Sequence, residues 1–261
     1  MNSLLGIPND PTATQLSSAT AITGGSLANL LSNRVGQVVR FGTGTVASNY
    51  IDIDFGAART LSFVALLWSN LRSTDSISVL ASTTAAHSGD VLNVAISPFY
   101  SSSKVTSVGT KSVATFTATS ARYWRVRLDC ATVHPDGFIQ ASRLTMGDKI
   151  DFAVDYSQLD LLDDDRGMVD RSDYGEDIED QRRISFGWRV RWRFGSQAEM
   201  LATHQRMVML GNTKPIVFCP IPSAANAQDL LAFGKLKSAA KSGSQVYDIW
   251  ELSFDIYSEA A

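Results

Sequence analysis

The chain has 261 residues, of which 44% are hydrophobic and 19% charged, and its formal net charge at pH 7 is −3. This composition is that of a folded protein of about two domains and argues against a disordered chain. A net charge so close to zero does not favour a nucleic-acid partner. The segment Met1 to Pro8 lacks the features of a secretory signal, and the longest apolar run, Phe63 to Trp68, is too short to span a membrane. We therefore expect a soluble protein, made in the cytoplasm, without membrane insertion.

Potential metal ligands are few. The two cysteines, Cys130 and Cys219, are too few for a disulfide framework or a structural zinc site, and only three histidines occur. A calcium-binding EF-hand beginning at Asp163 would need a glutamate where Tyr174 stands. We predict no metal centre and no cofactor, while a looser calcium site in the acidic stretch stays open.

Residues 1–32 are rich in Ser, Thr, Ala, Gly and Pro and show little periodicity. They are expected to form an extended N-terminal arm, with at most a short helical turn from Ser26 to Leu31. In assembling proteins such an arm often lies on a neighbouring subunit.

Residues 33–148 contain short strand patterns separated by turn residues, which favours an antiparallel β-sandwich. In the most informative one, Ala121 to Asp129, the side chains alternate between a core face (Trp124, Val126 and Leu128) and an outer face (Tyr123, Arg125 and Arg127). The other expected strands are Tyr50–Phe55, Leu61–Trp68, Ser76–Leu80, Val113–Thr117 and Ile139–Met146.

Residues 149–183 mark a shift in composition. From Asp160 to Asp180 the chain carries ten acidic residues and two arginines. A segment of this kind cannot form a core, so an acidic linker or exposed loop is expected.

Residues 184–261 are expected to form an α+β domain, with a sheet and one packed helix. The helix would start after Ser196, in a capping box with Glu199, and end at Gly211. The predicted apolar residues of this domain are Trp188, Trp192, Trp250 and Phe254 on two paired strands and Met200, Leu201, His204, Met207 and Val208 on the helix. The fold class is thus mainly β.

Charged residues alternate with these tryptophans. Arg189, Arg191 and Arg193 lie opposite the aromatic face, and Glu251 and Asp255 take the same place on the last strand. Proteins that read single-stranded nucleic acid by stacking need aromatics and cations on one face, so cross-strand salt bridges are the better interpretation. Their expected use is to fix register or to form a subunit interface.

Enzyme motifs are missing from the sequence: there is no G-x-S-x-G, Walker loop, G-x-G-x-x-G or H-E-x-x-H. The segment Gly109 to Ser112 is similar to a phosphate loop but lacks the upstream glycine. We predict that the chain is not an enzyme.

The strand order from Tyr50 to Gly147, and above all the segment Arg122 to Leu128, resembles discoidin-type, galactose-binding-like jelly rolls. Similar domains occur in tail-tip and baseplate proteins of tailed bacteriophages, and the C-terminal residues, from the Trp188 strand to the last strand, also look like phage tail proteins. The ligand sites of the jelly-roll family lie on loops at one end. Carried onto this chain, the resemblance implies a carbohydrate site of Arg34, Trp68, Asn70, Arg72 and Tyr100.

Two hypotheses follow. In the first, the chain is a non-enzymatic structural component of a phage tail tip or baseplate, located in the virion, which forms a ring or adaptor with copies of itself and with other phage tail proteins. In the alternative, it is a glycan-binding module that recognises a host cell surface. The loops would contact neighbouring subunits in the first case and a sugar in the second.

Overall fold

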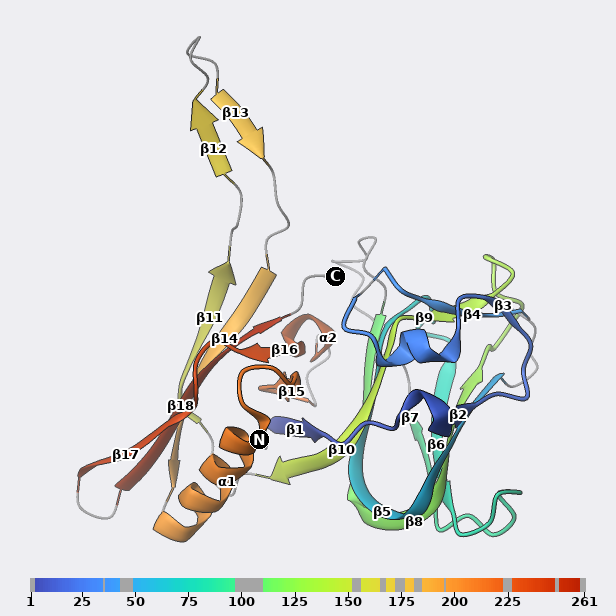
Figure 1. The fold of residues 1–261 in the computed structure, drawn as a ribbon, viewed down its shortest axis with the longest axis horizontal. Helices are drawn as coiled ribbons and strands as arrows, with labels where there is room; N and C mark the ends of the chain where they lie inside the picture. The colour runs from blue at the N-terminus through green and yellow to red at the C-terminus, as the bar shows by residue number, and fades with distance from the viewer. Residues whose placement is uncertain are drawn as a thin grey trace. The chain divides into compact units, whose positions relative to one another are not determined.

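The computed structural model describes residues 3–34, 36–42, 49–96, 110–151, 156–164, 168–171, 177–180, 185–194, 196–222, 227–246 and 249–258. The chain divides into two compact units (Figure 1). The sandwich unit comprises Gly6–Lys149 and Pro222–Leu231, and the helix unit comprises Met1–Leu5, Ile150–Ile221 and Ala232–Ala260.

The elements of the sandwich unit are η1 (Ala13–Gln15), β2 (Leu16–Ser17), β3 (Ile22–Gly24), η2 (Leu27–Leu31), β4 (Val39–Phe41), β5 (Asn49–Ser69), β6 (Ser76–Ser82), β7 (Leu92–Ile96), β8 (Thr110–Asp129), β9 (Ile139–Ala141), β10 (Arg143–Asp151) and α2 (Ala227–Leu230). Strand β1 (Leu4–Pro8) crosses the division between the units, as does the end of β10, whose last two residues belong to the helix unit. The elements of the helix unit are β11 (Tyr156–Asp164), β12 (Met168–Arg171), β13 (Asp177–Asp180), β14 (Ser185–Phe194), α1 (Gln197–Leu210), β15 (Ile216–Cys219), β16 (Ala232–Leu236), β17 (Lys241–Val246) and β18 (Ile249–Ser258).

The sandwich unit has two antiparallel sheets around one core. The main sheet has the order β10-β5-β8-β6-β7, with β2 paired to β5, and the second has the order β3-β4-β9. Buried side chains from both sheets form one hydrophobic cluster, which includes Ile53 of β5 and Trp124 of β8 from the main sheet and Phe41 of β4 and Ile139 of β9 from the second. The predicted antiparallel β-sandwich is confirmed.

Two long strands, β5 and β8, form the backbone of the main sheet. Each contains two of the predicted strands, because the chain bends without leaving the sheet: the β5–β8 register shifts between Asp54 and Arg59, near Gly56. Glycine suits this bend because its φ there is +75°. Beyond the bend β8 alternates as predicted, with Trp124 fully buried and Arg125 half-exposed.

The segment before β4 packs on its own sandwich. Leu16 and Leu30 belong to the core cluster, and the carboxylate of Asp10 accepts hydrogen bonds from the Arg143 guanidinium, the Thr145 hydroxyl and the Met146 N–H. Most of the stretch expected to be an extended arm, residues 1–32, is therefore tied to the sandwich unit by burial and by a buried ion pair. The expected helical turn is present as η2.

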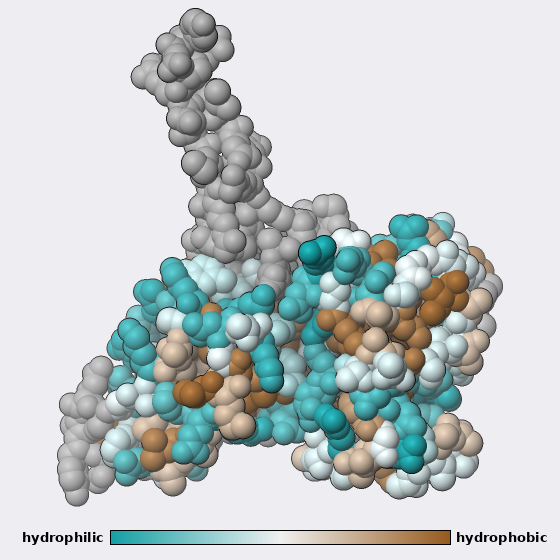
Figure 2. Space-filling model, viewed as in Figure 1, coloured by the Kyte–Doolittle hydropathy of each residue, from teal (hydrophilic) through white to brown (hydrophobic). Residues whose placement is uncertain are grey.

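Hydrophobic atoms reach the surface of the sandwich unit over η2, β3 and β4, as the brown atoms in Figure 2 show. Ile22 of β3 is 38% exposed there. Leu27 and Leu31 of η2 are only half-buried, although each packs against the core cluster. The elements η2, β3 and β4 thus form a layer that packs against the core on its inner side and exposes these hydrophobic residues on its outer side.

The helix unit contains an antiparallel sheet of order β11-β14-β18-β16-β15, with β17 paired to β18 and α1 packed against the sheet. Its centre is aromatic: the ring of Trp192 lies 5.8 Å from that of Phe218 and 5.2 Å from that of Phe254. Trp188 also faces Phe218. The predicted sheet with one packed helix is confirmed, including the pairing of the Trp188 strand with the last strand.

The buried stripe of α1 differs from the prediction. Met200 and Met207 are buried as expected, but Leu201 and Val208 are 40% and 52% exposed. The helix contacts its sheet along one narrow stripe of side chains, namely Met200, Thr203, Met207 and Leu210. Because the stripe is narrow, Leu201 and Val208, which each follow a stripe residue in the chain, face solvent. Ser196 stands at the N-cap but its side chain makes no capping hydrogen bond, contrary to the predicted capping box. Trp250 is only half-buried.

The acidic segment contains strands where a linker was expected. β11 pairs with β14 from Tyr156 opposite Trp192 to Asp164 opposite Ser185. β12 and β13 form a two-stranded sheet. Much of residues 149–183 therefore has regular backbone hydrogen bonding, which composition alone does not reveal.

Among the described residues, no helix is long and apolar enough to cross a membrane.

Candidate functional site

Two loops of the sandwich unit, one after β5 and one after β8, are joined by the side chain of Asn70. Its Nδ2 donates hydrogen bonds to Asp136 Oδ2 (2.9 Å) and to the Phe138 carbonyl (3.1 Å). Its Oδ1 accepts a hydrogen bond from the Gln140 N–H at 2.8 Å. One amide thus holds two positions of the second loop and one of β9 in place.

His134 supports the same loop from inside. It is 3% exposed; its Nε2 donates to the Asn70 carbonyl at 2.8 Å, and its Nδ1 accepts from the Asp136 N–H at 3.2 Å. The loop turns over it, because the Gly137 N–H donates to the His134 carbonyl. Pro135 fits the second position of this β-turn, and Gly137 adopts a φ of +72°.

A second connection runs through Arg72 and Asp75. The Arg72 guanidinium donates to both oxygens of the Asp75 carboxylate and to the side chain and carbonyl of Thr132. Asp75 also accepts from the backbone N–H groups of Arg72 and Ala131. Burial raises the pKa of Asp75, but hydrogen bonds from the Arg72 side chain and the two N–H groups outweigh it, so the pKa is below its ordinary value. The carboxylate is therefore held in its charged form.

The framework presents a small surface of four side chains, Arg40, Asp136, Phe138 and Gln140, called the loop surface below. The Arg40 guanidinium stacks over the Phe138 ring at 4.6 Å, and its Nε donates to Gln140 Oε1 at 3.2 Å. Phe138 and Gln140 are half-buried, Arg40 is exposed, and the Asp136 side chain is 50% exposed. The surface combines an aromatic ring, a cation, an amide and a carboxylate.

The five residues that the resemblance implied as a carbohydrate site do not form one exposed surface among the described residues. Trp68 is 3% exposed, with φ +55°, so its ring is not available to a ligand. Asn70 and Arg72 both lie in the loop after β5, and their polar groups bond that loop to the loop after β8. Arg34 is exposed, and its carbonyl accepts a hydrogen bond from the Ser142 hydroxyl. Tyr100 lies outside the described residues.

The residues of the loop surface were missed by sequence reasoning. One local signal was available: Pro135-Asp136-Gly137 is a turn signature between two strands, and Phe138 follows it directly. Arg40 had no local signal. It reaches Phe138 and Gln140 because β4 pairs with β9, with Arg40 opposite Gln140.

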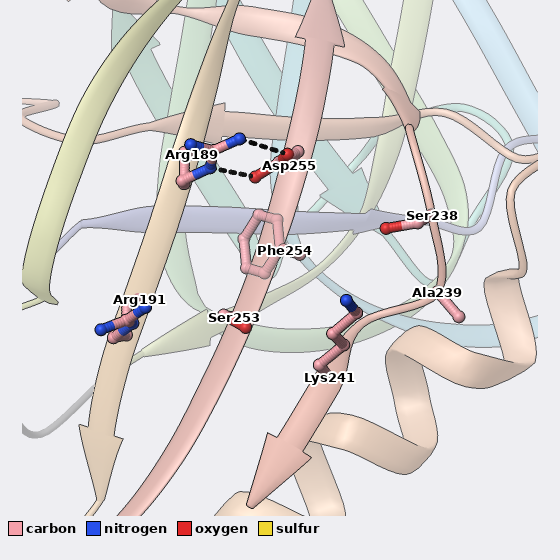
Figure 3. Close-up of a pocket in the computed structure, with 8 residues that line it drawn as sticks. All are labelled: Arg189, Arg191, Ser238, Ala239, Lys241, Ser253, Phe254 and Asp255. Carbon is pink, nitrogen blue, oxygen red and sulfur yellow. Dashed lines mark hydrogen bonds and ion pairs between the residues drawn. The ribbon is translucent and has the colours of Figure 1, made fainter.

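The predicted cross-strand charges of the helix unit do meet. Arg189 lies opposite Asp255 and donates to both carboxylate oxygens, at 3.0 and 3.2 Å (Figure 3). Arg193 lies opposite Glu251 and donates to it at 3.0 Å, whereas Arg191 approaches Glu251 only to 4.0 Å. These contacts lie within one sheet of one chain, and a role as a subunit interface stays a prediction.

The three histidines lie in separate places. His87 contacts Asp90, His134 lies in the loop framework, and Nε2 of His204 on α1 donates to the Ala240 carbonyl. Among the described residues no group of three or more His, Cys, Asp or Glu side chains is placed to hold a metal ion. Burial raises the pKa of the Cys130 thiol, which disfavours its reactive thiolate.

No protein-family model and no curated protein matches the chain. Among solved structures, the chain is similar to the CBM32 module of AlyQ in complex with 4,5-unsaturated mannuronic acid (17% identity, 57% of this chain and 98% of that one, TM-score 0.38). It is similar to a Streptococcus pneumoniae fucose binding module (10% identity, 54% and 95%, TM-score 0.38). It is also similar to truncated AlyQ with CBM32 and alginate lyase domains (14% identity, TM-score 0.38), where 59% of this chain spans only 35% of that one. At these scores and identities the similarity carries no conclusion about function.

Proposed function

We propose that the sandwich unit is a carbohydrate-binding module and that its ligand binds at the loop surface. The observation that carries the proposal is the stacked pair of Arg40 and Phe138 beside Gln140 and Asp136, held in place by Asn70. A sugar has one apolar face of C–H groups and a rim of hydroxyls. The loop surface offers the matching groups: the exposed part of the half-buried Phe138 ring, one side of which Arg40 covers, for the apolar face, and polar side chains for the hydroxyls.

The polar groups of the loop surface are suited to hydroxyls because they include donors and acceptors. Arg40 offers guanidinium N–H donors beyond the Nε that bonds Gln140, and the Gln140 amide offers an N–H₂ donor. The exposed Asp136 carboxylate is an acceptor, with one oxygen already bonded to Asn70. A hydroxyl both donates and accepts, so it can satisfy groups of either kind.

Preorganisation supports the same proposal. Binding costs less conformational entropy when the contacting groups are already ordered. Here the second loop is ordered by the bonds of Asn70 and His134, and the first by the Arg72–Asp75 pair. Two of the residues predicted to touch the sugar, Asn70 and Arg72, therefore serve the site as positioning residues.

The proposal is tested on a glycan array with three purified full-length proteins: the wild type, Phe138→Ala and Tyr123→Ala. Tyr123 is the matched control, because it is also a half-buried aromatic under an arginine, with the Arg122 guanidinium 4.8 Å from its ring. We expect the wild type to bind a subset of saccharides, Tyr123→Ala to bind them equally, and Phe138→Ala to lose about tenfold or more in affinity. The absence of any wild-type signal, or equal binding by Phe138→Ala, would contradict the proposal.

A further inference from the structure

A row of side chains crosses three strands of the helix unit on one face of the sheet. Arg191 of β14 lies directly opposite Ser253 of β18, and Lys241 of β17 lies opposite the same serine from the other side. Directly opposite residues of antiparallel strands point to the same face. The hydroxyl of Ser253 therefore has a cation on each side, as Figure 3 shows.

This row borders a pocket of about 210 Å³. Its wall is completed by Arg189 and Asp255 from the next row of the sheet, by Phe254 between Ser253 and Asp255, and by Ser238 and Ala239 before β17. At roughly 30 Å³ per water molecule the pocket has room for a small polyatomic group with some of its hydration water. The lining combines three cations, one carboxylate and two serine hydroxyls.

The charges of the two cations beside Ser253 are poorly compensated. Asp255 is engaged with both oxygens by Arg189, and Glu251 bonds Arg193 at 3.0 Å but lies 4.0 Å from Arg191. The neighbours of Arg191 in its row are Gln158 and Ser253, which are uncharged. Lys241 is exposed and makes no ion pair within the described part of the chain. The pocket therefore carries a local excess of positive charge.

We propose that this pocket is an oxyanion-binding site, in which Arg191 and Lys241 hold a phosphate, sulfate or carboxylate group above the Ser253 hydroxyl. The guanidinium of Arg191 is planar and matches two oxygens of such a group, and Lys241 adds a mobile point charge. The Ser253 hydroxyl donates a further hydrogen bond. The site lies on the helix unit and is independent of the carbohydrate proposal for the sandwich unit.

The proposal is tested by titrating the full-length protein with inorganic phosphate and, separately, with acetate, at low ionic strength. The readout is the NMR signal of the Arg191 Nε–H group, with that of Arg193 as internal reference. We expect the Arg191 signal to shift and saturate while that of Arg193 changes little. Tighter binding of phosphate would indicate a phosphoryl or sulfuryl ligand, and tighter binding of acetate a carboxylate ligand. Addition of salt should weaken either.

Two variants and a control complete the test. Lys241→Gln, followed by the same Arg191 signal, should weaken the binding of the preferred anion by about tenfold, the expected loss of one charge-assisted hydrogen bond. Arg191→Gln removes that signal, so its binding is followed by the backbone amide signal of Ser253 and should weaken at least as much. Lys214→Gln removes an exposed lysine outside the pocket and should bind as the wild type does. The proposal is overturned if neither anion saturates the Arg191 signal, if Lys241→Gln binds as tightly as the wild type, or if Lys214→Gln weakens binding as much.

Discussion

At the scale of single residues, the candidate site depends on side chains that a ligand would not touch. Asn70 bonds two positions of the second loop and one of β9, and His134 and Asp75 complete the framework. Such supporting residues decide whether a binding surface is rigid enough to recognise its ligand. Their replacement should affect stability and binding together.

Asn70→Ala is the sharpest test of this framework. It leaves the Gln140 N–H and the Phe138 carbonyl without their partner, and an unmet buried polar group costs about 1–3 kcal/mol. We expect urea unfolding to show a stability loss of that order, and saccharide affinity to fall although Phe138 is intact. Unchanged affinity in Asn70→Ala would show that the loops are ordered by other contacts.

The lowered pKa of Asp75 predicts how the framework responds to acid. A carboxyl whose pKa is lower in the folded than in the unfolded state contributes stability that is complete above its ordinary value of 3.8. That contribution is lost as the pH falls through the folded-state pKa. Wild-type unfolding free energy should therefore decrease below about pH 4, and Asp75→Asn should flatten this decrease.

The control for this pH effect is Asp54→Asn. Arg122 lowers the pKa of Asp54 to about 2, yet both side chains are more than two-fifths exposed, at 44% and 43%. Exposed pairs contribute little to stability. If Asp54→Asn reduces the loss of unfolding free energy below about pH 4 as much as Asp75→Asn does, the hydrogen bonds of Asp75 are not the main source of that loss.

At the scale of elements, β14 shows how one strand serves a core and a charged surface. Trp192 is fully buried among Phe218 and Phe254, whereas the Arg191 side chain is 41% exposed. Trp192→Ala should destabilise the helix unit by about 3–5 kcal/mol, because it removes a large core side chain. Arg191→Glu should change stability by about 1 kcal/mol or less. Thermal unfolding of both variants would check this, and equal losses would contradict the assignment of the faces.

The alternation of side chains was enough to predict these faces from the sequence. Trp124 and Val126 of β8, like Trp192 of β14, are buried as their spacing predicts. Composition was a poorer guide: the acidic stretch contains β11, because backbone pairing with β14 does not depend on side-chain polarity. The helix was located correctly, but its buried face was predicted only in part: Met200 and Met207 are buried and Leu201 is not, since the width of the contact depends on the sheet beneath the helix.

The candidate site was harder to predict for a physical reason. Asn70 and Arg72 were recognised as important polar residues, but their partners Asp136 and Thr132 lie 66 and 60 positions away in the chain. No local pattern reveals such bonds. The same holds for Arg40, whose contact with Gln140 bridges 100 positions. Which polar groups are consumed within the fold and which remain exposed therefore emerges only when the strands are paired.

At the scale of the whole molecule, the chain joins a sandwich unit and a helix unit, each with its own buried aromatic residues. A place in a phage tail, and assembly into a ring, stay predictions. Size-exclusion chromatography with light scattering tests them: a tail adaptor should form a stable oligomer that Arg191→Glu impairs. A wild-type monomer would contradict the ring and leave carbohydrate binding untouched.

The central claim is that a saccharide binds at the loop surface of the sandwich unit. Hydrogen–deuterium exchange of the full-length protein, with and without the strongest ligand from the array, tests it most directly. We predict slower exchange in residues 131–140 and 70–75, which carry Phe138 and its supporting bonds. Protection confined to residues 189–193 and 251–255 of the helix unit, or no protection in either loop, would contradict the claim.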